Sequence, residues 1–422
     1  MRSSLKSARY AQGVSDLQVL ARDLAVDIVL TGSILRTGDR VRVSAELVSV
    51  PAGDVWWSRT THVPVHEALE IHDDLARHVV ASLPLTSADR ARPPQAGAAS
   101  PEAFDLYLRG MQLRTESATW LKAYDFFERC LALDPSFAPA WAERGRLDRV
   151  LGKWEALSRQ AQAESAFLRA LSLDPDNGAA QYYYAQLEID VGRLEDALER
   201  LLARVHRRRA EPHVYAALVH ACRYAGLLAE SVAAHHEAQR LDPTIATSVH
   251  HTYYMQGDYA RALAAAPQTS DPFEPHVLGA MGRDAEALAA TGRDETRFGS
   301  SPALGAFVTG LRAALDGRAD DTIAALAPLE TVWHSDGEAL FYAGGIYARA
   351  GLRARALAML DRAVTAGFLC LPAFERDVYL APLREGELWH ALMARLEPAH
   401  RRAVDRFTRA GGPSVLGPAM RT

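Results

Sequence analysis

The chain has 422 residues, of which 49% are hydrophobic and 23% charged, and its formal net charge is −5. This balance is typical of a globular protein and excludes a largely disordered chain. A mildly acidic chain without a basic stripe is not expected to bind nucleic acid. Its apolar runs are too short to cross a bilayer, and its three widely spaced cysteines favour free thiols, so we expect a cytoplasmic protein without membrane insertion.

The first hundred residues are predicted to form a small α/β domain. Apolar and polar residues alternate with a period of two, as at Val41, Val43, Ala45 and Leu47, which is the pattern of half-buried strands. We expect a three-stranded meander over about 28–36, 40–49 and 54–61. Helices are predicted before it, from Ser15 to Leu24, and after it, from Ala68 to Leu83. The domain then spans residues 1–84, and the Pro-rich stretch 85–100 is a linker.

This segment resembles the TolB-amino-terminal-like domain that bacteria place before helical-repeat arrays. The matching residues are Asp27–Ser33, Gly38–Val43, Ala45–Val48 and the turn from Gly53 to Trp57. The resemblance implies a further strand and helix upstream, so we expect an incomplete domain. It also implies that a Ser/Thr protein kinase, a nucleotide cyclase or a winged-helix DNA-binding domain often precedes such a pair of domains.

An internal repeat occupies most of the chain. A glycine followed five residues later by a small residue recurs, and successive glycines lie 34, 31, 25, 35 and 34 residues apart. The pairs are Gly192/Ala197, Gly226/Ser231, Gly257/Ala262, Gly282/Ala287, Gly317/Thr322 and Gly351/Ala356. Each glycine is predicted to end one helix with a positive φ, and the small residue lets the next helix approach closely. The tripeptide Leu-Asp-Pro, as at Leu133–Pro135 and Leu173–Pro175, closes the second helix.

These units resemble the tetratricopeptide repeat, most clearly at Gly344, Tyr347, Gly351, Ala356 and Leu360. The resemblance predicts a mainly α fold, a superhelical solenoid of α–α hairpins preceded by the small α/β domain. We expect about eight hairpins over 101–371, with short units near 246–302. Residues 372–410 break the period and are predicted to form capping helices, and 411–422 to be a disordered tail.

The sequence has no recognisable catalytic, metal or cofactor constellation. It contains no phosphate-binding G-x-x-x-x-G-K-[ST], no G-x-G-x-x-G and no kinase or hydrolase motif, and Arg240 stands where a zinc-binding H-E-x-x-H would need its second histidine. His62 and His66 are separated by Pro64, which disfavours helical metal ligation. We therefore expect no enzyme activity, no cofactor and no metal. The oligomeric state stays open.

A binding surface is expected on the first helices of the hairpins, which line the concave face of a tetratricopeptide solenoid. The side chains predicted to face this groove combine aromatic rings, hydrogen-bond donors and a cation, which suits an acidic peptide. They are Tyr182, Gln186, His213, His220, Arg223, His250 and Tyr254. A solvated groove without a partner is the alternative.

Two functions from different classes remain open at this level. The first is a non-catalytic scaffold of a bacterial signalling system that binds a peptide or partner domain. The second is the C-terminal regulatory fragment of a Ser/Thr protein kinase or an adenylate or guanylate cyclase whose catalytic part lies upstream. A groove that senses a small molecule is a lesser alternative.

Overall fold

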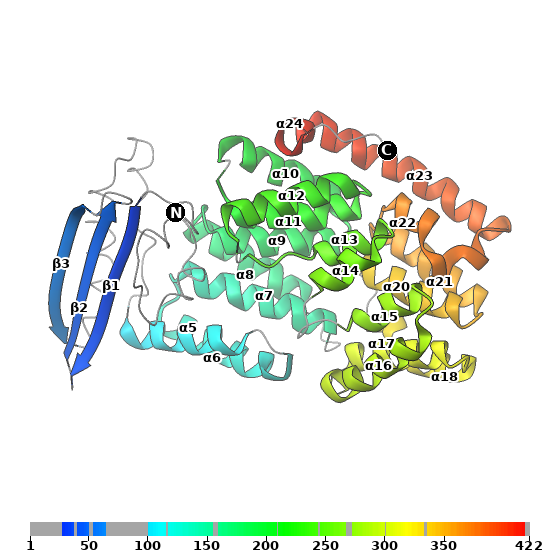
Figure 1. The fold of residues 1–422 in the computed structure, drawn as a ribbon, viewed down its shortest axis with the longest axis horizontal. Helices are drawn as coiled ribbons and strands as arrows, with labels where there is room; N and C mark the ends of the chain where they lie inside the picture. The colour runs from blue at the N-terminus through cyan, green and yellow to red at the C-terminus, as the bar shows by residue number, and fades with distance from the viewer. Residues whose placement is uncertain are drawn as a thin grey trace. The chain divides into compact units, whose positions relative to one another are not determined.

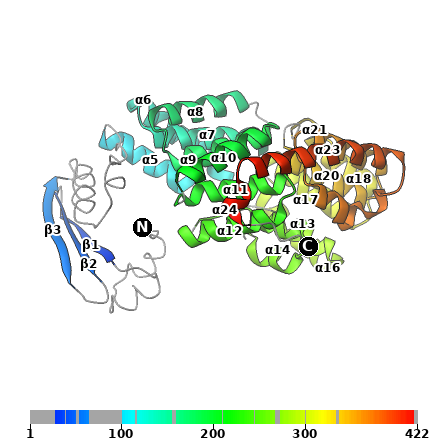
Figure 2. The ribbon, with the colours of Figure 1, turned by 90° about the horizontal axis from the view of Figure 1, so that it is seen from above.

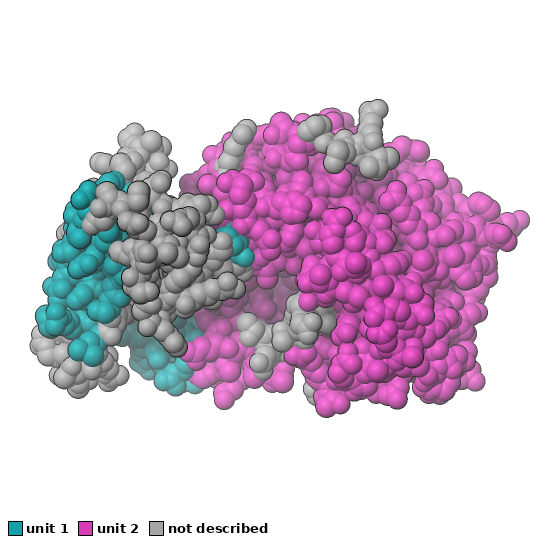
Figure 3. All heavy atoms as spheres, viewed as in Figure 1, with its two compact units in different colours: residues 1–109, 128–137, 242–244 teal, residues 110–127, 138–241, 245–422 magenta. Residues whose placement is uncertain are grey.

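The computed structural model describes residues 28–37, 40–49, 54–64, 100–114, 117–154, 159–208, 210–243, 245–266, 272–299, 301–332 and 336–417. By its internal contacts the chain divides into two compact units, which Figure 3 shows in different colours. The first unit holds residues 1–109, 128–137 and 242–244. The helices predicted over 15–24 and 68–83, and the predicted linker 85–100 except for Ser100, lie outside the described residues.

The three predicted strands form one antiparallel sheet in the order β1-β2-β3 (Figure 1). They are β1 (Ile28–Thr37), β2 (Arg40–Ser49) and β3 (Val55–Pro64). Along β2 the predicted alternation is confirmed, because Ala45 and Leu47 are buried whereas Arg42 and Glu46 are exposed. The register shifts by one residue where Leu47 pairs with Trp57 and Val48 pairs with Val55. Trp56 is left without a cross-strand partner in this bulge and is exposed, while Trp57 is half-buried.

The remaining elements are helices, and eight consecutive hairpins can be followed among the described residues (Figures 1 and 2). The paired helices are α5 (Pro101–Leu113) with α6 (Trp120–Leu133), α7 (Ala138–Trp154) with α8 (Gln160–Leu173), α9 (Gly178–Asp190) with α10 (Leu194–Arg207), α11 (Pro212–Tyr224) with α12 (Leu228–Leu241), α13 (Val249–Met255) with α14 (Tyr259–Ala265), α15 (Glu274–Ala280) with α16 (Asp284–Phe298), α17 (Pro302–Leu315) with α18 (Ala319–Leu326), and α20 (Gly337–Arg349) with α21 (Arg353–Thr365). Short turns, η2 (Ser117–Thr119) and α19 (Leu329–Val332), lie in two of the connections. No helix of the described part is both long and apolar enough to cross a membrane.

The repeated glycines make the turns that the sequence predicts. All six have φ between +73° and +81° and each follows the first helix of its hairpin. A residue with a Cβ is strained in this left-handed region, whereas glycine is not. The small residue five positions later is completely buried in every one of the six hairpins, from Ala197 to Ala356. The two sequence markers therefore correspond to the turn and to the close packing of each helix pair.

The middle of the array is shorter than the rest. The helices α13, α14 and α15 have seven residues each, which is about 10 Å, whereas α9 to α12 have 13 or 14 residues, about 20 Å. This is the part that the 25-residue spacing between Gly257 and Gly282 predicted to be short. Later helices of the array contact earlier ones: Arg223 of α11 bonds Glu338 of α20, and α17 contacts α7.

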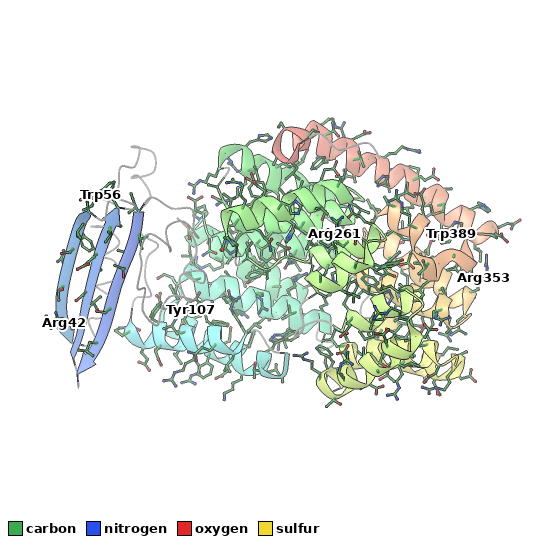
Figure 4. The ribbon with its side chains drawn as sticks, viewed as in Figure 1. Arg42, Trp56, Tyr107, Arg261, Arg353 and Trp389 are labelled. Atoms are coloured by element: carbon green, nitrogen blue, oxygen red, sulfur yellow. The ribbon has the colours of Figure 1, made fainter. Side chains whose placement is uncertain are left out.

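A cap follows the array. It consists of α22 (Leu371–Arg376), η3 (Val378–Leu383) and the long helix α23 (Glu387–Arg409). Trp389 of α23 is buried, and Arg353 at the start of α21 donates hydrogen bonds to backbone carbonyls of the turn before α23, those of Pro382, Leu383 and Glu385 (Figure 4 labels Trp389 and Arg353).

The prediction that the chain is disordered from residue 411 is wrong for residues 411–417. Gly411, with φ +81°, ends α23, and a further helix, α24 (Gly412–Leu416), begins directly after it. Gly412 is buried, and Val415 and Leu416 pack against the main core. The apolar residues of this segment are therefore ordered by packing on the core. The polar and glycine-rich residues around them are the reason why the sequence predicted disorder. Residues 418–422 lie outside the described residues.

The turn glycines give a matched pair of substitutions. Gly282→Ala should destabilise the protein by about 1–2 kcal/mol, which is the cost of placing an alanine in the left-handed region. No steric clash adds to this cost, because a Cβ at this position meets nothing within 4 Å. Gly226→Ala should lose about 1–3 kcal/mol more, since its Cβ would lie 2.8 Å from His400 and 3.0 Å from Pro372. Urea denaturation of the two variants measures the difference. Equal losses would contradict the packing of the cap against the α11–α12 turn.

Candidate functional site

The seven residues predicted to line the groove lie where the repeat pattern placed them along the chain. Tyr182 and Gln186 belong to α9, and the others belong to α11 and α13, the first helices of their hairpins. Their exposure divides them into two groups. His213 is exposed, and Tyr182 and Gln186 are half-buried. The other four, His220, Arg223, His250 and Tyr254, are buried.

Arg223 is the centre of the buried group, with no exposed surface. Its Nε and Nη2 donate to the two carboxylate oxygens of Glu338 at 2.7 and 2.9 Å, and Nη1 donates to the carbonyl oxygen of Ser248 at 2.9 Å. Burial opposes the charge on Glu338, but Arg223 holds the pKa of that carboxyl below its usual range. This two-pronged ion pair joins α11 to α20 inside the protein.

A second ion pair joins α7 to the same end of α20. Asp336 caps α20 by accepting from the backbone N–H of Ala339 at 3.1 Å, and it also accepts from Tyr224 Oη at 3.0 Å. Its other carboxylate oxygen pairs with Lys153 Nζ. Burial would raise the pKa of Asp336, but Lys153 keeps it below the usual value. Both carboxylates at the start of α20 are therefore ionised and paired.

The chain of contacts continues into α9. His220 Nδ1 lies 3.0 Å from Arg223 Nη2, and because a guanidinium only donates, Nδ1 accepts and the ring proton is on Nε2. That Nε2 faces Asp190 Oδ1 at 4.0 Å. Burial, together with the charge on Arg223, holds the pKa of His220 well below its usual value, so the ring is neutral. Arg149 completes the set by donating to Asp190 Oδ2 at 2.6 Å and to Gln186 Oε1 at 3.0 Å.

His250 and Tyr254 lie in an aromatic cluster around α13, α15 and η3. Tyr254 Oη donates to Asp377 Oδ2 at 2.8 Å and lies 3.0 Å from His276 Nε2. The ring of His250 packs against Phe273 with centroids 5.3 Å apart. Burial raises the pKa of Asp377 to about 6. Both side chains thus serve the packing between the short hairpins and the cap.

The prediction that His220, Arg223, His250 and Tyr254 face an open groove is therefore wrong. They do lie on first helices, but later segments pack against them: Glu338 of α20 bonds Arg223, and Asp377 at the start of η3 bonds Tyr254. Helical periodicity alone did not show this, since it gives the face of a helix on which a residue lies and not what covers that face.

Tyr182, Gln186 and His213 keep contact with solvent, and two arginines that the sequence analysis missed lie beside them. Arg146 of α7 donates to the carbonyl oxygen of Arg114 at 3.0 Å, and its guanidinium lies 5.8 Å from the ring centre of Tyr183. Arg114 follows α5 and donates to Glu143 and to Tyr183 Oη at 3.1 and 3.0 Å. Both arginines occur in ordinary helical patterns, so only their spatial neighbours single them out.

In two ion pairs that α7 makes, the carboxylate lies deeper than the cation. The exposed side-chain fractions are 5% for Glu143 against 25% for Arg114, and 3% for Asp336 against 17% for Lys153. We name the open inner face a set of five residues that reach solvent on or beside the first helices α7, α9 and α11: Arg114, Arg146, Tyr182, Gln186 and His213.

Among the described residues, no group of three or more His, Cys, Asp or Glu side chains is arranged to hold a metal. His62 lies on β3, and His66 lies outside the described residues. The cysteines Cys130, Cys222 and Cys370 are free and buried. Burial raises the pKa of the Cys370 thiol to about 12 and that of Cys130 to about 11, which keeps both protonated and poorly nucleophilic near neutral pH.

The second unit is thus a helical-repeat solenoid closed by its own later helices and a cap. Residues 158–220, which contain α8, α9, α10 and most of α11, match the tetratricopeptide repeat family. Such arrays present extended surfaces to protein partners. A putative adenylate cyclase 3 of Rhizobium meliloti (strain 1021) is 26% identical over 184 residues, which is 42% of this chain and 31% of that protein. The match therefore spans about a third of that relative.

Two solved structures resemble the chain more distantly. The crystal structure of the APC/C hetero-tetramer Cut9–Hcn1 aligns with a TM-score of 0.40 at 14% identity, over 81% of each chain. The TPR domain of P58(IPK) aligns with a TM-score of 0.24 at 13% identity, over 74% of this chain and 99% of that one.

Removing one partner of the buried Arg223–Glu338 ion pair should destabilise the protein far more than removing one partner of an exposed ion pair. Arg223→Met should destabilise the protein by about 3–5 kcal/mol, because it leaves Glu338 charged and buried. The double variant Arg223→Met/Glu338→Met should recover part of this loss. Arg395→Ala, which breaks a half-exposed pair with Asp361, should lose less than about 1 kcal/mol. Urea denaturation compares the three; equal losses would mean that α20 does not close on α11.

Asp377 should make stability depend on pH. Its folded-state pKa of about 6 exceeds the ordinary 3.8, so its protonated form favours the folded state. The stabilisation is complete below pH 3.8 and is lost as pH rises through about 6, by on the order of 3 kcal/mol. Asp377→Asn removes the ionisable carboxyl and should remove this term; its one amide oxygen can replace the acceptor of Tyr254 or that of the Tyr379 N–H but not both, a loss that does not depend on pH. The difference in unfolding free energy between wild type and variant, followed from pH 4 to 7, measures it; a constant difference would refute it.

Proposed function

We propose that this chain is a non-catalytic interaction scaffold of a bacterial signalling system, and that it binds an acidic peptide or partner domain in the cytoplasm. The hairpin array and the repeat match at residues 158–220 support a scaffold. The buried thiols suit a reducing compartment. The three-stranded meander before the array agrees with the resemblance to the TolB-amino-terminal-like domain.

The proposal rests on one observation about the open inner face: the carboxylate there is more deeply buried than the cation that it pairs with. The carboxylate of Glu143 lies deeper than the Arg114 guanidinium that it neutralises, with side-chain exposures of 5% and 25%. A guanidinium has five N–H donors, and Arg146 spends one of them on the carbonyl oxygen of Arg114. An approaching carboxylate therefore finds donors before it meets another carboxylate. The rings of Tyr182 and His213, 6.4 Å apart, add apolar area beside those donors.

A second function rests on the relative found in Rhizobium meliloti. We propose as the alternative that the chain is a regulatory portion of a nucleotide cyclase, because the partial match is to a putative adenylate cyclase. The DNA directly upstream of the codon for Met1 decides this: an in-frame cyclase catalytic sequence would support the alternative, and an unrelated or out-of-frame sequence would exclude it for this gene.

Charge reversal tests the binding site. Arg146→Glu should weaken the binding of a short fluorescein-labelled peptide, in which glutamate alternates with leucine, by about tenfold or more, since interface anchors are worth about 1–2 kcal/mol and the new charge repels the peptide. Fluorescence anisotropy at low salt measures the dissociation constant. Binding to the wild-type chain should weaken as salt is added.

Arg401→Glu is the matched control. Arg401 lies on α23, is largely exposed and makes only a 3.9 Å contact with Glu397, so the same change of charge should leave both peptide binding and melting unaltered. An equal loss of peptide affinity in the two variants would indicate a nonspecific effect of charge. The open inner face would then not be the binding site. Circular dichroism of each variant verifies that the helices are intact.

A further inference from the structure

A partly enclosed pocket, lined by none of the residues of the open inner face, lies between the start of α9 and the C-terminal end of α10. It has a volume of about 330 Å³. Its lining comes from the turn before α9, from the first turns of α9 and from the last turn of α10 and the residue after it: Pro175, Asp176, Gln181, Arg204, Arg207 and Arg208. Three of these six residues are arginines.

Two of the arginines are held in place by carboxylates. Arg204, which is 8% exposed, donates from Nε and Nη2 to the carboxylate of Glu211 at 2.6 and 3.1 Å. Arg208 donates to Asp176 Oδ2 at 2.6 Å. Glu211 and Asp176 come from different turns of the array, so the guanidinium groups are fixed from two sides. Fixed guanidinium groups lose little conformational entropy when an anion binds.

Arg207 is exposed and has no ion-pair partner among the described residues, so three positive charges face two negative ones. A cation at the C-terminal end of a helix is ordinary, because the helix dipole favours it. The dipole does not explain why Arg204, Arg207 and Arg208 line one pocket, since each could point into solvent. The pocket therefore carries one uncompensated positive charge in a partly enclosed space.

From this arrangement we infer that the pocket binds a phosphate monoester. A phosphate group carries about two negative charges and accepts several N–H bonds, which matches guanidinium donors. The side chain of Asp176 is 36% exposed; its Oδ2 accepts from Arg208 and its Oδ1 lies 3.5 Å from Arg204, so an incoming phosphate would compete with it for Arg208. The volume exceeds that of a bare phosphate and admits part of the group that carries it. The source is either a phosphorylated side chain of a partner or a small phosphate ester.

Isothermal titration with a phosphoserine peptide and with inorganic phosphate tests the inference on the full chain. The wild type should bind both at low salt, and Arg207→Ala should weaken binding by about tenfold, the loss expected for one charge-assisted contact. Arg401→Ala on α23 is the control and should bind as the wild type does. Phosphate bound without the peptide assigns the pocket to a small ester; peptide bound more tightly than phosphate assigns it to a phosphorylated partner.

Asp176→Asn distinguishes phosphate binding from a purely structural role more clearly than Arg207→Ala does. Because the carboxylate of Asp176 competes with the ligand for Arg208, its neutralisation should strengthen phosphate binding about threefold or more. A purely structural role for these residues would give no gain in affinity. The inference is overturned if the wild type shows no heat of binding with either probe, or if Arg207→Ala and Asp176→Asn bind as the wild type does. Neither variant changes the open inner face, so the outcome is independent of acidic-peptide binding there.

Discussion

The guanidinium of Arg223 is fully buried, and the carboxylate that neutralises it belongs to Glu338, 115 residues further along the chain. Taking these charges out of water is expensive, and their attraction roughly offsets that expense, so the pair contributes little net stability. The pair instead restricts which folds the chain can adopt, because any fold that buries one of these charges without the other is strongly disfavoured. Lys153 and Asp336 impose the same condition between α7 and α20. The start of α20 must therefore lie against both α7 and α11.

Apolar packing supplies the free energy that these charges do not. Tyr224 of α11 packs edge-on to Phe368, with ring centres 5.0 Å apart, and Phe368 and Phe374 enclose Phe341 of α20. All of these rings are buried, and burial of aromatic side chains dominates the energetics of such cores.

The packing of α20 on α7 and α11 divides the arginines into two kinds: those whose donors are used inside the fold, and those that remain available to partners. Arg223 has its donors bound to Glu338, Ser248 and His220, and nothing of it reaches solvent. On the open inner face, Arg114 pairs with the buried Glu143 and Arg146 donates to a backbone carbonyl, and both arginines are half-exposed. At the end of α10, Arg207 has no carboxylate of its own among the described residues. The same residue type therefore has three roles, decided by how many of its donors the fold already uses.

Local patterns in the sequence determined the three strands, the hairpin turns and the small buried residue of each hairpin. They also located the short middle units, because positive-φ glycines and 3.6-residue periodicity depend on neighbours along the chain. Tertiary structure alone decided that His220, Arg223, His250 and Tyr254 are covered, and that residues 412–416 form a helix on the core. Both depend on contacts between residues more than a hundred positions apart, and on how far the array curves. Periodicity carries no information about such contacts, because it reports the face on which a side chain lies and not which distant segment packs there.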